Sequence, residues 1–191
     1  MSQIPTRADA WALLNEYTDN PSLIKHALAV EAAMRGYARR FSEDEETWGI
    51  IGLIHDFDYQ QNPTEETHLH VGCGILRERG WPEEWVRAVA SHADYMGVPR
   101  DTPMAKTLFA VDELAGFLTA CALVRPDKAI AEVKLKSVKK KLKDKAFARG
   151  VNRDDVRHGA EELGVELGDH IEFVRDAMAT VADELGLPPS S

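Results

Sequence analysis

The sequence has little cysteine and no long apolar run. Its 191 residues contain two cysteines, Cys73 and Cys121, which are far apart and form no Cys-x-x-Cys pair. Neither a disulfide framework nor a thiolate zinc site is therefore expected. No apolar stretch reaches the ~20 residues that span a bilayer, and the first seven residues lack the basic and then apolar pattern of a signal peptide. These absences predict a cytoplasmic protein that has no membrane partner.

Positive charge is also in short supply. The chain has 23 Lys and Arg against 32 Asp and Glu, which gives a formal net charge of -9. This balance opposes nonspecific attraction to a polyanion, so nucleic acid is not an expected partner. With 44% hydrophobic and 29% charged residues, the composition is that of an ordinary globular protein. Residues 1–191 are expected to form a single domain.

Several catalytic signatures are missing. The sequence has no Gly-x-x-x-x-Gly-Lys-Ser/Thr phosphate loop, no Gly-x-Ser-x-Gly elbow and no His-Glu-x-x-His pair. The pair Gly72-x-Gly74 lacks the third glycine of a dinucleotide fingerprint. These absences argue against P-loop nucleotide hydrolysis, serine hydrolysis and the common zinc protease chemistry.

Helical periodicity is present almost everywhere, and no useful stretch alternates as a strand does. Proline after a capping residue predicts helix starts at Pro21 and Pro103, Ser42 with Glu45 forms a capping-box pattern, and Asn152 caps a further helix. Other helices are expected over 67–79, from Pro82, through a lysine-rich stretch to about Phe147, and along a last stripe of Ile171, Val174, Met178, Val181 and Leu185. The expected fold is all-α, a compact helical bundle with additional C-terminal helices.

Four polar side chains are expected to face the interior of this bundle. His26 shares a helical face with the apolar residues three before and four after it, and Asp112 lies among apolar residues on a later helix. His55-Asp56 ends the apolar run of residues 50–54, although a simple helix end could also carry this pair. Buried nitrogen and oxygen donors on three helices would relieve their desolvation by binding one divalent ion.

In this order, His26, His55-Asp56 and Asp112 resemble the H...HD...D signature of the HD-domain superfamily of metal-dependent phosphohydrolases, in its HD or HDIG form. The most diagnostic segment is 52–58, Gly-Leu-Ile-His-Asp-Phe-Asp. The resemblance implies that residues 20–125 form the HD-domain core and that 126–187 are a helical extension packed on it. It also implies that the four residues bind a catalytic metal ion.

Two further histidines match positions that bind a second metal in several members of that family. His68 begins a His-x-x-x-Gly-x-x-x-Leu segment, and His92 lies near the end of the following helix. The resemblance implies that they bind a second metal or hold substrate phosphate, so the site has one or two divalent ions. The ligand types suit Mn, Fe, Co, Ni or Mg. His70 projects elsewhere on a helix and is expected at the surface, and Asp58 is left as either an orienting carboxylate or a solvated one.

The resemblance implies hydrolysis of a small phosphoester, such as a nucleotide, by metal-activated water, with Asp56 and His55 as the catalytic pair. A small phosphorylated molecule is the expected partner. Two alternatives stay open, because the same family contains diiron oxygenases and because an HD domain can be a catalytically silent signalling or binding module.

A lysine-rich stretch is the sequence's candidate for holding an anionic substrate. Seven lysines lie between Lys134 and Lys145, where Lys139 and Lys143 share one helical face, and Lys106 lies two turns before the aspartate on its helix. Lys106, Lys139 and Lys143 are the candidate substrate-binding residues. A solvated helix face is the simpler explanation of such a run.

Overall fold

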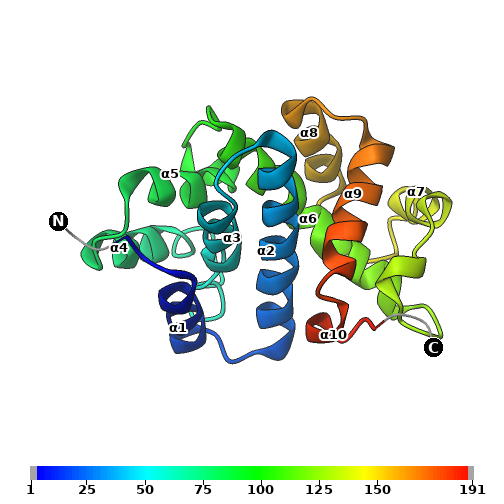
Figure 1. Cartoon of the computed structure of the whole chain (residues 1–191), viewed down its shortest axis with the longest axis horizontal. Coiled ribbons are helices and arrows are strands. Elements are labelled where there is room, and N and C mark those ends of the chain that lie inside the picture. Colours follow the sequence, from blue (N-terminus) through cyan, green and yellow to red (C-terminus); the bar gives the residue numbers. More distant parts are fainter. Residues whose placement is uncertain (1–3, 189–191) are drawn as a thin grey trace.

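The computed structural model describes residues 4–188, and these residues form helices and no strand (Figure 1). This arrangement confirms the all-α prediction. Two short 3-10 helices, η1 (Asp94–Met96) and η2 (Ile130–Glu132), accompany the α-helices. The α-helices are α1 (Arg7–Tyr17), α2 (Pro21–Phe41), α3 (Glu45–Ile54), α4 (His70–Glu78), α5 (Glu83–Ser91), α6 (Pro103–Leu123), α7 (Leu135–Lys143), α8 (Arg153–Leu163), α9 (Leu167–Ala179) and α10 (Ala182–Leu185).

Helix α2 is the central element of the bundle. It packs against α3, α6, α9 and α10, so that α1 and α3–α5 lie on one side of it and α7–α10 on the other (Figure 1). Its close approach to α3 depends on Gly52, because a Cβ there would lie 3.0 Å from the backbone of Glu31. This contact brings the C-terminal part of α3 next to the middle of α2.

Helix starts follow the capping signals at three positions. The Asn20 side chain accepts from the Ser22 amide before Pro21, and the Thr102 side chain accepts from the Ala105 amide before Pro103. Asn152 caps α8 in the same way. These polar caps satisfy amides that the helix itself leaves without partners.

Other local expectations were wrong. Ser42 is the left-handed C-cap of α2, with φ 59°, and Asp44 caps α3 instead by accepting from the Thr47 amide. Helix α4 begins at His70 rather than at 67, because Leu69 has φ 61°. The last expected helix is interrupted between α9 and α10, and α1 was not expected at all.

The helices of the described chain are too short or too polar to cross a membrane. The expectation about a signal peptide concerned the first seven residues, of which 1–3 lie outside the described part. Residues 189–191, the other end of the expected single domain, lie outside it as well.

Candidate metal centre

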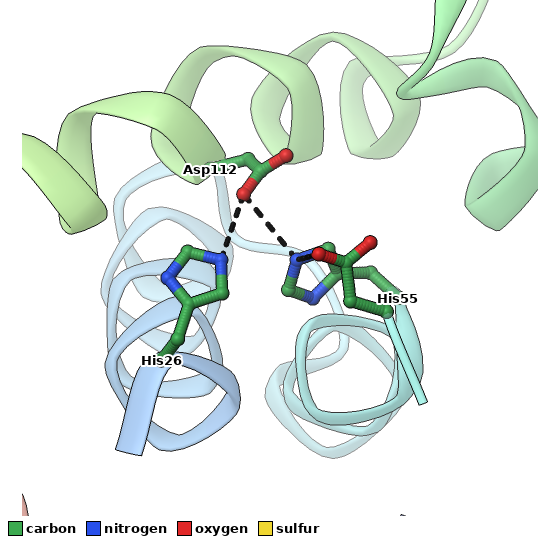
Figure 2. Close-up of side chains that lie close together, drawn as sticks. His26, His55 and Asp112 are labelled. Atoms are coloured by element: carbon green, nitrogen blue, oxygen red, sulfur yellow. Dashed lines mark hydrogen bonds and ion pairs between the residues drawn. The ribbon is translucent and has the colours of Figure 1, made fainter. Parts of the chain in front are cut away.

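Three elements bring the first group of ligand-type side chains together. His26 lies on α2, Asp112 on α6, and His55 and Asp56 directly follow α3. Asp112 reaches toward both imidazoles in Figure 2, with Asp112 Oδ1 2.9 Å from His26 Nε2 and 3.3 Å from His55 Nε2. Asp56 Oδ2 lies 3.5 Å from the same His55 nitrogen. One potential ligand atom from each of the four residues lies within 4.8 Å of the others.

A second group shares Asp56 with the first. His68, in the turn before α4, places Nε2 3.1 Å from Asp56 Oδ1, and His92, just after α5, places Nε2 3.2 Å from the same oxygen. Both histidines are buried. The six residues predicted as ligands therefore converge on adjacent groups joined by one carboxylate.

The hydrogen bonds of the histidines fit a divalent cation. His55 Nδ1 lies 2.7 Å from the Gly52 carbonyl and His92 Nδ1 lies 2.6 Å from the Val89 carbonyl. A carbonyl only accepts, so these nitrogens carry the hydrogens, and in a neutral imidazole each Nε2 then directs a lone pair at a carboxylate. Two facing lone pairs require a proton or a cation between them.

His55 gives the strongest evidence of such a fit. Its side chain is fully buried, and its Nε2 has no hydrogen-bond partner within residues 4–188. An unpartnered buried nitrogen is costly unless it is a ligand. Imidazole and carboxylate donors suit several divalent transition metals, so the residues present fit the metal that the sequence predicted.

Asp58 orients His68, a member of the second group. It is fully buried, and its oxygens accept from the backbone amides of Leu69 and Gly72 and lie 3.1 Å from His68 Nδ1. Since the carboxylate accepts the Nδ1 hydrogen, the His68 Nε2 lone pair is directed at Asp56. The sequence left Asp58 open between an orienting and a solvated carboxylate, and the structure shows a buried one.

The charges of the cluster shift its pKa values in a consistent way. Burial lowers the pKa of His55, but the negative charges of Asp56 and Asp112 outweigh it and raise the pKa. Burial also opposes the charged form of His68, yet hydrogen bonds to Asp56 and Asp58 raise its pKa to about 9. In return the imidazoles lower the pKa of Asp56 well below its ordinary value, despite its burial. The carboxylates thus hold positive charge beside them.

A cavity of about 410 Å³ opens above this cluster. Metal-ligand candidates form part of its wall, namely Asp56, His68, His92 and Asp112, whereas the fully buried His55 does not line it. Sequence reasoning missed the rest of the wall, which contains Tyr59, Glu65, Ala93, Asp94, Tyr95, Phe109, Glu113, Asn152 and Asp155. Proximity to His92 and Asp112 in sequence could have indicated Asp94, Tyr95 and Glu113, but nothing indicated Asp155.

Glu113 of α6 and Asn152, which directly precedes α8, contact each other at this cavity. The Asn152 amide donates to Glu113 Oε2 over 3.0 Å, so the start of α8 closes the cavity against α6. Burial and the neighbouring charge of Asp112 raise the pKa of Glu113 to about 7.

The candidate lysines lie outside this wall. Lys106 lines two neighbouring cavities, while Lys139 and Lys143 are exposed on α7, with Lys139 Nζ 3.9 Å from Glu166. Their contact with substrate stays a prediction. His70 is exposed, as expected.

Comparison with known proteins gives one match. The family model described as HD domain matches residues 23–116, a segment that contains all six candidate ligands. No curated protein and no solved structure matches the chain.

Proposed function

We propose that this protein hydrolyses a small phosphoester, such as a nucleotide, with water activated by divalent metal ions. Residues 23–116 belong to the HD domain family, whose members are mostly metal-dependent phosphohydrolases. The observation that carries the proposal is the position of Asp56. Its carboxylate belongs to both groups of ligand-type side chains and also lines the cavity. A substrate in the cavity would therefore lie directly against the metal centre.

Two metal positions follow from the grouping of the side chains. Ions bound there lower the pKa of a bound water and polarise a phosphoryl oxygen. The second position rests on three protein ligands, which leaves room for water and substrate on the cavity side. The first would be held by His26, His55, Asp56 and Asp112, and the second by Asp56, His68 and His92.

The members of the expected catalytic pair have different roles in this proposal. Asp56 lines the cavity, so its carboxylate can accept the proton of the attacking water. His55 has no surface in the cavity and contacts Gly52 through its other nitrogen. Its role is to bind the metal, and Gly52 fixes the orientation of the ring.

A phosphatase screen tests the proposal. Purified protein would be assayed on nucleotides and sugar phosphates with Mn, Co, Ni or Mg, and Asp56→Ala should lose several kcal/mol of transition-state stabilisation. Asp154→Ala is the matched control, since that carboxylate is 94% exposed and does not line the cavity. If no phosphoester is turned over, or if Asp56→Ala keeps wild-type activity, the proposal is wrong.

The alternative of a diiron oxygenase is separated by iron loading. An oxygenase would show a mixed-valent diiron signal in electron paramagnetic resonance and would consume oxygen with an organic substrate. A silent signalling domain would bind metal and do neither reaction. The hydrolase proposal expects phosphate release without oxygen consumption.

A further inference from the structure

The cavity wall carries much more negative than positive charge. Six of its residues are carboxylates: Asp56, Glu65, Asp94, Asp112, Glu113 and Asp155. No lysine or arginine of residues 4–188 belongs to the wall. The cavity is a candidate ligand site on separate grounds, because four residues of the two ligand-type groups form part of its wall: Asp56, His68, His92 and Asp112.

Arg100, a cation that contacts two residues of the wall, is already paired. Arg100 binds Glu162 through two nitrogens and Asp94 through a third contact of 2.7 Å, and its guanidinium covers the Phe109 ring at 3.7 Å. Among the six carboxylates it hydrogen-bonds Asp94, and its charge also favours the ionised form of Asp155. Two divalent ions would bring four positive charges to the other five carboxylates, of which Glu113, with a pKa of about 7, is only partly charged near neutral pH. Little positive charge would then be left over for a phosphate.

The start of α8 does not supply a phosphate site either. Two of the free amides of its first turn, those of Asp154 and Asp155, donate to the Asn152 side chain. The side chain of Asp155 adds a carboxylate to the cavity at the same helix end. A substrate whose only charge is its phosphate dianion would therefore add negative charge that no lysine or arginine of the described wall offsets.

We propose that the substrate carries a positively charged amino group beside its phosphoryl group, and that Glu113 and Asp155 bind this group. The inference rests on the proposed function and names its substrate class, an aminoalkyl phosphoester. The metal centre receives the phosphoryl end, and the carboxylates on α6 and α8 receive the ammonium. Tyr59 and Tyr95 supply aromatic rings in the same wall, a residue type that favours ammonium groups.

A matched pair of substrates isolates the amino group. 2-Aminoethyl phosphate and 2-hydroxyethyl phosphate have nearly the same size and differ by an ammonium against a hydroxyl. With manganese-loaded protein, we expect kcat/KM to be about tenfold or more higher for the amine, since the wall attracts one and not the other. Equal values, or a preference for the hydroxyl compound, would overturn the inference.

Variants assign the preference to the wall. Glu113→Gln and Asp155→Asn should each reduce the ratio of the two kcat/KM values toward one, and Asp154→Asn should leave it unchanged, because Asp154 is on the same helix but outside the cavity. Circular dichroism checks that each variant folds, and Asp155→Asn alone suffices if Glu113→Gln does not fold. An unchanged ratio in the folded cavity variants contradicts the assignment.

Binding measurements keep this inference separate from the hydrolase proposal. If no phosphoester is hydrolysed, the proposed function fails, and calorimetric titration of the manganese-loaded protein with the same two compounds still tests the wall. Tighter binding of the amine would support the inference, and equal binding would overturn it. Preferred hydrolysis of nucleotides carrying magnesium would show instead that the wall binds a metal counter-ion.

Discussion

At the scale of single residues, the proposed second metal position would depend on a carboxylate outside the two ligand-type groups, that of Asp58. Asp58 holds the ring of His68, and the amides of Leu69 and Gly72 hold Asp58. Leu69 adopts a positive φ of 61°, which is costly for a leucine and places its amide toward that carboxylate. The amides of the strained Leu69 and of Gly72 thus both hold the carboxylate of Asp58.

Gly72→Ala should weaken the second metal position. A Cβ at residue 72 would lie 2.7 Å from the Asp58 carboxyl carbon, so Asp58 must move and His68 loses its partner. We expect the manganese content of dialysed protein, measured by mass spectrometry, to fall from two ions per chain toward one. Gly74→Ala is the control in the same helix, because a Cβ there meets no atom within 4 Å. Equal metal contents in the two variants would argue against the role of Asp58.

The sequence predicted which side chains gather at the candidate centre better than it predicted their surroundings. His26, His55, Asp56 and Asp112 are separated by helical segments whose inward faces could be read from apolar periodicity, and the family resemblance added His68 and His92. The wall could not be read this way. Tyr59 and Glu65 lie in an irregular segment, and Asp155 reaches the cavity only because α8 packs on α6.

At the scale of elements, the contact between α6 and α8 positions that wall. Gly159 lies against Ala110, and a Cβ at residue 159 would lie 2.6 Å from the Ala110 Cα. Backbone cannot give way as a flexible side chain can. Asn152 and Asp155 on the same helix therefore reach the cavity because residue 159 has no side chain.

Gly159→Ala should push α8 away from α6 and destabilise the protein by about 1–3 kcal/mol, as overpacking does. Urea unfolding measures the loss. Gly116→Ala in α6 is the comparison, since a Cβ there meets no atom within 4 Å and should stabilise the helix by about 0.5–1 kcal/mol. If Gly159→Ala is as stable as Gly116→Ala, the helices are not in the close contact described.

Helix starts were predictable where a capping residue was followed by apolar residues at helical spacing. Pro21 and Pro103 begin helices as expected, each after a side chain that caps it. The Ser42 pattern failed because Ser42 ends α2 in the left-handed conformation, and Asp44, two residues later, caps α3. Helix α1 was missed because its apolar residues are spread around the helix instead of along one face, although Thr6 and Asp9 form a capping box. It packs on α3.

At the scale of the whole molecule, His170 joins α9 to α2 and α6. It is fully buried on α9, with Nδ1 2.6 Å from the Tyr37 hydroxyl of α2 and Nε2 2.8 Å from the Ala110 carbonyl of α6. The carbonyl must accept, so Nε2 carries the hydrogen and Nδ1 accepts from the hydroxyl. Both contacts are satisfied by the neutral ring, and this pairing spans three helices.

The stability contributed by His170 should be lost in acid. Burial, assisted by the positive charge of Arg40, lowers its pKa below the ordinary 6.5, although the bond to Ala110 opposes this. Above that ordinary value both folded and unfolded chains are neutral here and the contribution is complete; as the pH falls, the unfolded chain binds the proton first and the free energy of unfolding drops. His55, His68 and His92 have raised pKa values and act in the opposite direction in the metal-free protein.

The variant His170→Gln keeps these three histidines and removes only the imidazole that titrates at position 170. Urea unfolding of metal-free wild type and variant at about pH 8 and pH 5.5 should therefore show their stability difference shrinking in acid by on the order of 1 kcal/mol. A difference that is independent of pH would mean that His170 is not held neutral in the folded protein.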